Sequence, residues 1–315
     1  MVGDIGGTNT RLALYDAPSG ELTQVRAYLN SDFSKLEEVV ARWLKEAEST
    51  NGKPVAVHAC CLAIAAPPMG DQVNMLNVDW SFSKRAFARE FGFEQLGCIN
   101  DFEGNAYALP HLQANELVSL RGDYQTQGKK CAVVGPGTGL GGATLDLTGT
   151  SVLASASEPG YAGLSPANDL EIELFRELFH RYDTVWAELL LSGPGLERLH
   201  STLASVRGNS VEPLTAAQIT EAALNGGDCH SRDVLKVFCA LLGSACGDYV
   251  LTTGSYGGLF LAGGIVPRIS DFLAKSEFLQ RFSSKGKMKS VLSEVPVHLI
   301  TCPTLGLLGA AHAPL

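Results

Sequence analysis

Two short segments of this 315-residue chain combine glycine, threonine and a carboxylate in a way that suits phosphate chemistry. The first is Asp4-Ile5-Gly6-Gly7-Thr8-Asn9, and the alternating residues after it predict a returning strand. Adjacent glycines permit a turn with positive φ and let a ligand approach the backbone closely. An ordinary hairpin turn has the same composition, so this segment alone supports both interpretations.

A second copy of the pattern favours the functional interpretation. Residues 131–146 repeat the layout of apolar strand, Gly-Thr turn and returning strand, and they align Gly137 with Gly7 and Thr138 with Thr8. Backbone N–H groups and threonine hydroxyls are donors that bind phosphate oxygens. We therefore expect the two turns to grip one polyphosphate from two sides.

The two copies differ at one position that matters for a metal. The first copy has Asp4 where the second has Val134, so one carboxylate is left to hold a hydrated Mg²⁺. The residues predicted to bind the polyphosphate and its metal are Asp4, Gly6, Gly7, Thr8 and Asn9 in the first copy and Gly137, Thr138 and Gly139 in the second.

The glycines of the second copy also satisfy G-x-G-x-x-G over residues 137–142, the fingerprint of a dinucleotide-dependent oxidoreductase. That fingerprint requires a helix next, whereas residues 142–147 resemble a strand. A Walker A loop is excluded because no lysine follows the glycines. The oxidoreductase remains a remote alternative.

Several further elements are expected around these turns. Residues 55–66 are apolar and small, as in a buried central strand, and a strand over 96–99 leads directly into Asn100-Asp101. Ligands of open α/β sheets bind beyond the carboxyl ends of strands, yet Asn and Asp at this place are also common helix caps. Capping boxes are predicted at 34–37 and 215–218.

Composition limits the class of protein. Hydrophobic residues make up 45% and charged residues 18% of the chain, as in a soluble globular protein, and the net charge of −9 argues against a nucleic-acid partner. No signal peptide or membrane-spanning run is expected. The eight cysteines have no C-x-x-C spacing and indicate a reduced, cytoplasmic protein. Only three residues precede Asp4, so the first strand is expected to be short or incomplete in this sequence.

Five motifs, in this order, resemble those of the bacterial glucokinase family, and the match runs nearly end to end. They are Asp4–Asn9, Asn100-Asp101, Gly135–Gly142, Ser192–Gly195 and Leu261–Pro267. The resemblance implies an α/β fold of the two-domain, actin-like ATPase (ribonuclease H-like) type with an interdomain cleft, and a homodimer. We expect a small domain over 1–110 plus about 298–315, and a large domain over 111–297.

The activity implied by the resemblance is ATP-dependent phosphorylation of glucose at its 6-hydroxyl, the first step of glycolysis. Asp101 is the predicted base that accepts the proton of the hydroxyl, and Asp4 is expected to hold Mg²⁺ through a water molecule. Gly263 and Gly264 would approach the nucleoside, although close strand–helix packing explains them nearly as well. The sugar contacts that the resemblance implies are Asn100, Asp101, Glu158 and Glu188, with Asn77 and Trp80 as candidates that could equally be a turn residue and a packing residue.

One substitution leaves the choice of sugar open. Tyr161 stands where the family has a histidine, and tyrosine is larger and does not become charged near neutral pH. Tyr161 is therefore a candidate sugar contact, and a kinase for another hexose is the first alternative. A non-catalytic sugar sensor is the second, and the presence of both Asp4 and Asp101 argues against it.

Overall fold

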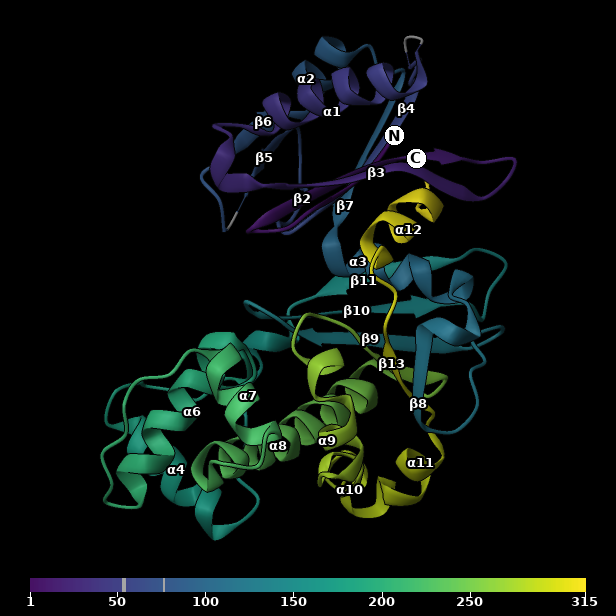
Figure 1. Ribbon diagram of the computed structural model, residues 1–315. Helices are drawn as coiled ribbons and strands as arrows, with labels where there is room; N and C mark the ends of the chain where they lie inside the picture. Colours follow the sequence, from purple (N-terminus) through teal and green to yellow (C-terminus); the bar gives the residue numbers. More distant parts are fainter. Residues whose placement is uncertain (53–54, 76) are drawn as a thin grey trace. The chain divides into compact units, whose positions relative to one another are not determined.

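The computed structural model describes residues 1–52, 55–75 and 77–315, which form two compact units (Figure 1). Unit 1 comprises Met1–Leu112, Leu153–Ala156 and Cys302–Leu315, and unit 2 comprises Gln113–Val152 and Ser157–Thr301. These limits differ from the predicted ones at three places, the first being that unit 1 continues to Leu112 and not to residue 110. Residues 298–301 belong to unit 2, because β13 (Val297–Ile300) pairs with β12 (Gly258–Leu261), and Leu153–Ala156 belongs to unit 1.

Unit 1 is built on a five-stranded sheet with the order β3-β2-β1-β4-β7. Its strands are β1 (Val2–Ile5), β2 (Asn9–Asp16), β3 (Glu21–Leu29), β4 (Ala59–Ile64) and β7 (Gln95–Asn100). β1 is antiparallel to β2 and parallel to β4, and β4 is parallel to β7. The carboxyl ends of β1, β4 and β7 therefore meet at one edge of the sheet.

The α-helices in the described part of unit 1 are α1 (Leu36–Asn51), α2 (Lys84–Phe91), α3 (Asp101–Ala108) and α12 (Leu305–His312). Val39, Val40 and Trp43 recur at helical spacing on α1, and all three are buried in the core of unit 1. The chain's last helix, α12, packs against α3. β5 (Gln72–Asn74) and β6 (Ser81–Ser83) form a separate antiparallel pair, and β11 covers Leu153–Ser157.

Unit 2 contains a mixed sheet whose strands follow the order β10-β9-β12-β13-β8. They are β8 (Leu117–Arg121), β9 (Lys130–Pro136), β10 (Leu140–Asp146), β12 and β13. β9 and β10 form an antiparallel hairpin, and β9 runs parallel to β12. The α-helices of this unit are α4 (Asp169–Phe179), α5 (Ala187–Leu190), α6 (Gly193–Val206), α7 (Ala216–Leu224), α8 (Cys229–Thr253), α9 (Ser270–Lys275), α10 (Phe278–Ser283) and α11 (Lys289–Glu294).

The long helix α8 is the centre of the helical part of unit 2, where it packs against α6, α7 and α10 (Figure 1). By length and composition it could cross a membrane, contrary to the sequence prediction that no apolar run is long enough. However, 78% of its apolar window is buried inside the protein. Burial among neighbouring helices accounts for this apolar composition, as in the core helix of a soluble protein.

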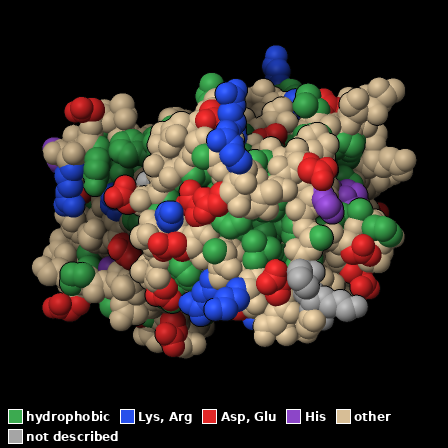
Figure 2. Space-filling model, turned by 90° about the horizontal axis from the view of Figure 1, so that it is seen from above, with side chains coloured by type: hydrophobic (Ala, Val, Ile, Leu, Met, Phe, Trp, Pro, Cys, Tyr) green, Lys and Arg blue, Asp and Glu red, His purple; other side chains and the backbone are tan. Residues whose placement is uncertain are grey.

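Charged side chains of both signs share the face of the molecule shown in Figure 2, where Lys and Arg lie singly or in small groups among Asp and Glu. This mixture is expected of a chain with 24 basic and 33 acidic residues.

Candidate active site

The first Gly-Thr segment is a hairpin turn, as predicted. β1 ends at Ile5, β2 begins at Asn9, and the Gly6 N–H donates to the Asn9 carbonyl over 3.0 Å. Thr8 and Asn9 are exposed at the tip of this turn. The turn therefore presents a hydroxyl and backbone groups to solvent, as a phosphate-binding turn requires.

A buried asparagine that the sequence analysis missed holds this turn in shape. The Asn30 side chain donates to the Gly6 carbonyl over 2.8 Å and accepts from the Thr10 hydroxyl over 2.9 Å. Its backbone N–H donates to the Thr8 carbonyl over 2.9 Å, and only 3% of the residue is exposed. A single Asn after a strand carries no distinctive sequence signal, so Asn30 is recognised only from these contacts.

Asp4 lies directly before the first turn and is largely buried. Burial raises the pKa of Asp4, and the Arg11 guanidinium opposes this rise from 3.3 Å away. No group of three or more His, Cys, Asp or Glu side chains that could hold a metal occurs among the described residues. One carboxylate beside a phosphate-binding turn fits Mg²⁺, which keeps several waters and takes few protein ligands.

Asn100 and Asp101 lie at the carboxyl end of β7, where α3 begins. Asn100 is the N-cap, since its side chain accepts from the backbone N–H groups of Phe102 and Glu103, and Glu103 accepts in return from the Asn100 N–H. Asp101 is the first helical residue and accepts from the Phe102 N–H over 3.0 Å. The capping role considered for Asn100 is confirmed.

Capping alone does not explain what distinguishes Asp101, because α4 begins with the same Asn-Asp-x-Glu sequence at residues 168–171 and is also capped by its asparagine, Asn168, which accepts from the Glu171 N–H. The difference is position. Asp101 follows β7, which is two strands from β1 in the sheet. With a strand spacing of about 4.8 Å, Asp101 and the Gly6–Thr8 turn lie roughly 10 Å apart at the same sheet edge.

The loop candidates Asn77 and Trp80 have different environments. Asn77 is exposed and packs on the first turn, where a Cβ added to Gly7 would lie 2.6 Å from the Asn77 Cβ. Trp80 is 5% exposed and belongs to the core of unit 1. Of the two, Asn77 is therefore the one accessible to a ligand, and Trp80 is a packing residue.

The second Gly-Thr segment is also a hairpin turn, between β9 and β10. Gly137 N–H donates to the Gly139 carbonyl, and the Gly137 carbonyl accepts from the Gly193 N–H, each over 2.8 Å. Thr138 is exposed at the tip, as Thr8 is in the first turn. Ser192, the first residue of the Ser192–Gly195 motif, is the N-cap of α6, and its side chain accepts from the Gly195 N–H.

Three predicted sugar contacts gather beside the second turn. One oxygen of the half-buried Glu188 accepts from the Leu140 N–H over 2.8 Å. Burial and the neighbouring Glu188 raise the pKa of Glu158, and Glu188 raises the pKa of Tyr161, which is 66% exposed. Two carboxylates and one phenol thus face a common region of unit 2, and all can bind sugar hydroxyls.

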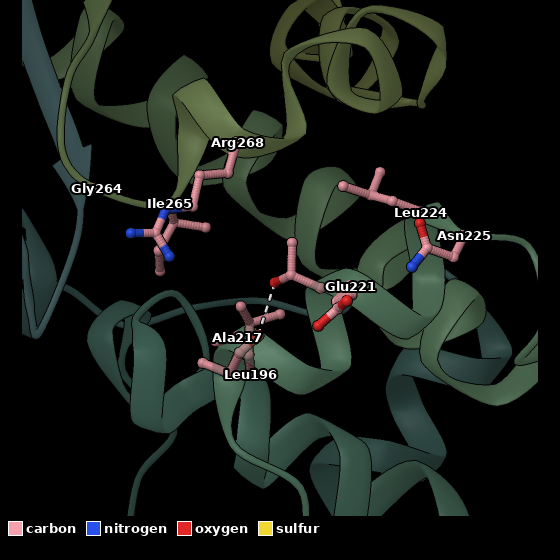
Figure 3. Close-up of a pocket in the computed structure, with 10 residues that line it drawn as sticks. Leu196, Ala217, Glu221, Leu224, Asn225, Gly264, Ile265 and Arg268 are labelled. Carbon is pink, nitrogen blue, oxygen red and sulfur yellow. Dashed lines mark hydrogen bonds between the residues drawn. The ribbon is translucent and has the colours of Figure 1, made fainter.

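A pocket of about 400 Å³ lies beside the glycine pair (Figure 3). Gly264, Ile265 and Arg268 line one side, and the other is lined by residues of α7, including Glu221, and by its C-cap Asn225. Its volume suits a ligand the size of a nucleoside. Gly263 does not line this pocket: its φ is +89°, and a Cβ there would lie 2.5 Å from the Pro136 carbonyl oxygen. A side chain at Gly263 would therefore collide with the end of β9, whereas Gly264 borders the pocket.

Comparison with known proteins identifies the chain's relatives. A family model described as Glucokinase matches residues 1–314. The chain belongs to the glucokinase family. A glucokinase of Saccharophagus degradans is 39% identical over 315 residues, covering 99% of this chain and 96% of its own length. A glucokinase of Caulobacter vibrioides is 41% identical over 318 residues, covering 99% and 94%.

Solved structures agree with membership of the glucokinase family. A glucokinase from an Antarctic psychrotroph has a TM-score of 0.86 and 39% identity, with 99% of this chain and 97% of that chain covered. A glucokinase of the ROK family from Streptomyces griseus, solved in complex with glucose and AMPPNP, has a TM-score of 0.66 at 19% identity, with 98% and 96% covered. The fold is that of the actin-like ATPases, as the sequence predicted.

Proposed function

We propose that this protein transfers the γ-phosphoryl group of ATP to the 6-hydroxyl of glucose. The observation that carries the proposal is the arrangement in unit 1, where a Gly-Thr turn and Asp101 lie at one edge of the same sheet. Phosphoryl transfer needs a phosphate-binding turn, a positioned hydroxyl and a carboxylate that orients it. Membership of the glucokinase family supports glucose as the acceptor.

In the proposed reaction, the glucose 6-hydroxyl donates a hydrogen bond to Asp101. The hydroxyl oxygen attacks the γ-phosphorus, the bond from that phosphorus to the β–γ bridging oxygen breaks, and ADP leaves. The proton of the hydroxyl passes late to the Asp101 carboxylate. Asp4 would hold Mg²⁺ through water, and the ion supplies charge neutralisation to the phosphates when bound.

Each unit by itself has its own set of proposed contacts. Unit 1 would bind phosphate with Gly6, Gly7, Thr8 and Asn9 and sugar with Asn77, Asn100 and Asp101. Unit 2 would bind phosphate with Gly137, Thr138 and Gly139 and the nucleoside beside Gly264, with Gly263 shaping the adjoining strand end. Its sugar contacts would be Glu158, Tyr161 and Glu188. That the Streptomyces griseus glucokinase was solved with glucose and AMPPNP supports this ligand pair.

Another hexose is the second candidate substrate, because the family histidine is replaced by Tyr161, which is 66% exposed and has its pKa raised by Glu188 and Glu158. Comparing kcat/KM for glucose, mannose, fructose and N-acetylglucosamine separates the two. We also propose a cytoplasmic homodimer without nucleic-acid or membrane partners, which sedimentation and cell fractionation would test.

The base assignment is tested with a matched pair of variants. Asp101 and Asp169 are both first residues of Asn-capped helices, so Asp101→Ala and Asp169→Ala remove the same helix-end carboxylate. We expect Asp101→Ala to lower kcat by about 10²- to 10⁴-fold and Asp169→Ala to leave it unchanged. Near-normal sugar-dependent ADP release by Asp101→Ala would refute the assignment.

A further inference from the structure

The carboxylate of Glu188, a proposed sugar contact, also accepts a hydrogen bond inside the protein, from the Leu140 N–H. We infer that Glu188 is a positioning residue for the nucleotide, because it fixes the Gly137–Gly139 turn in the shape that binds phosphate. The inference rests on the proposed function of that turn, and it adds to the sugar contact a role that does not require sugar.

The hydrogen bond from Leu140 is the main evidence. Leu140 is the first residue of β10 after the turn, it is 2% exposed, and its N–H donates to Glu188 Oε2 over 2.8 Å. Hydrogen bonds to a carboxylate are stronger than those between neutral groups, and a buried N–H without an acceptor is costly. The first N–H of the returning strand therefore depends on a side chain 48 residues further along the chain.

Close packing brings the carboxylate against the turn itself. A Cβ added to Gly139 would overlap the Glu188 carboxylate, so only glycine leaves room for this contact. The same segment reaches the other end of the turn, because the Gly193 N–H donates to the Gly137 carbonyl over 2.8 Å. Ser192 joins the two contacts, since its hydroxyl donates to the Glu188 carbonyl over 2.9 Å. Residues 188–193 thus hold both ends of the turn.

Unit 1 has a parallel contact, which shows that the arrangement is not peculiar to one turn. Asn77, a proposed sugar contact, packs on Gly7 of the first Gly-Thr turn. In each unit, a side chain proposed to bind sugar rests on a glycine next to the exposed threonine. A residue shared by two ligand sites couples their binding free energies reciprocally.

Glu158 supplies the control. It is the other carboxylate of the proposed sugar contacts, and burial and the neighbouring Glu188 raise its pKa. Within the described part of the chain, no hydrogen bond joins the Glu158 side chain to the Gly137–Gly139 turn. If both glutamates only bind sugar, replacing either one should leave nucleotide binding in the absence of sugar unchanged. If Glu188 also positions the turn, replacing Glu188 alone should weaken that binding.

The test measures binding of Mg-AMPPNP by calorimetry without any sugar. We expect Glu188→Ala to weaken this binding about tenfold, the effect of losing one charge-assisted hydrogen bond at the turn. Glu188→Gln should stay within about threefold of the unsubstituted protein, because its amide oxygen can accept from Leu140. Glu158→Ala should bind the nucleotide normally. Gly139→Ala, which keeps Glu188 but displaces its carboxylate, should weaken binding as Glu188→Ala does.

The outcomes separate this inference from the proposed function. Normal AMPPNP binding by Glu188→Ala, together with weakened sugar binding, would overturn the positioning role and leave the kinase assignment intact. Equal losses of AMPPNP affinity in Glu188→Ala and Glu158→Ala would also overturn the positioning role. Failure of the unsubstituted protein to bind AMPPNP or to release ADP with any hexose would count against the proposed function itself. Circular dichroism of each variant confirms that its fold is retained.

Discussion

Arg281→Met is expected to destabilise unit 2 strongly, because Arg281 is half of an ion pair inside that unit. Its side chain is 8% exposed and that of its partner, Glu171, is 1% exposed. Two guanidinium nitrogens donate to the two Glu171 oxygens over 2.6 and 3.0 Å, and a third donates to the Ser244 hydroxyl over 3.1 Å. Methionine fills much of the same volume but leaves the carboxylate without its counter-charge.

The size of the destabilisation depends on the hydrogen bonds that Glu171 keeps when Arg281 is replaced. It still accepts from the Ala167 N–H over 2.7 Å and from the Asn168 amide over 3.0 Å, so its oxygens keep neutral donors only. Removing one partner of a buried ion pair costs about 3–5 kcal/mol. For a unit of this size, each kcal/mol lowers Tm by about 2–4 °C, which gives a shift of roughly 6–20 °C.

The assay is urea and thermal unfolding followed by circular dichroism, with Arg176→Met as the control. Arg176 pairs with Glu173 on the surface of α4, where the two side chains are 63% and 50% exposed, so its loss should cost under about 1 kcal/mol. The double variant Glu171→Leu/Arg281→Met should recover most of the loss, because it removes both charges. Equal destabilisation by Arg281→Met and Arg176→Met would refute the reasoning.

Three further predictions concern the candidate site. Burial and Glu188 raise the pKa of Glu158, so the KM for sugar should rise as pH falls through that raised pKa. Glu188→Gln should move this rise to lower pH, and an unmoved profile between pH 4.5 and 8 would contradict the coupling. Asn30→Ala should lower the free energy of unfolding in urea by about 1–3 kcal/mol and raise the KM for ATP, because the buried partners of Asn30 lose their hydrogen bonds. A normal KM would show that the first turn does not depend on Asn30. Glu103→Ala should lower kcat several-fold while Glu103→Gln retains it, since the amide can still accept from the Asn100 N–H; equal rates for both would exclude a positioning role for the capping box.

Local patterns predicted those parts of the fold that neighbouring residues determine. Both Gly-Thr hairpins form as expected, because turn residues between two apolar strands specify a hairpin within one short segment. The capping box at Thr215 is confirmed. The one predicted at Ser34 is wrong: α1 begins at Leu36, and the Ser34 hydroxyl and N–H both bind Glu38 instead. Glu37 and Glu38 are both possible partners for Ser34, and the sequence spacing does not determine which of them accepts its hydrogen bonds.

Contacts between residues far apart in the sequence are the part of the candidate site that the sequence did not predict. Residue type indicates Asp101 and both turns, and the family resemblance indicates Glu188. The bond between Glu188 and Leu140, however, depends on the packing of α5 and β10 on the short turn Pro159–Tyr161. The contacts of Asn30 with Gly6 likewise join residues that only the pairing of β2 with β3 brings together. The observed domain limits differ from the predicted ones for the same reason. β13 belongs to unit 2 because it pairs with β12 and β8, and its own residues do not show which strands it will pair with.

The central claim is tested most directly by ³¹P and ¹³C NMR of glucose incubated with Mg-ATP and the unsubstituted protein. The account predicts glucose 6-phosphate and ADP in equal amounts, formed with saturation at low glucose and about 10²- to 10⁴-fold more slowly by Asp101→Ala. Phosphate transfer to a different hexose in preference to glucose would change the substrate and retain the chemistry. No sugar phosphate from glucose, mannose, fructose or N-acetylglucosamine would contradict the account.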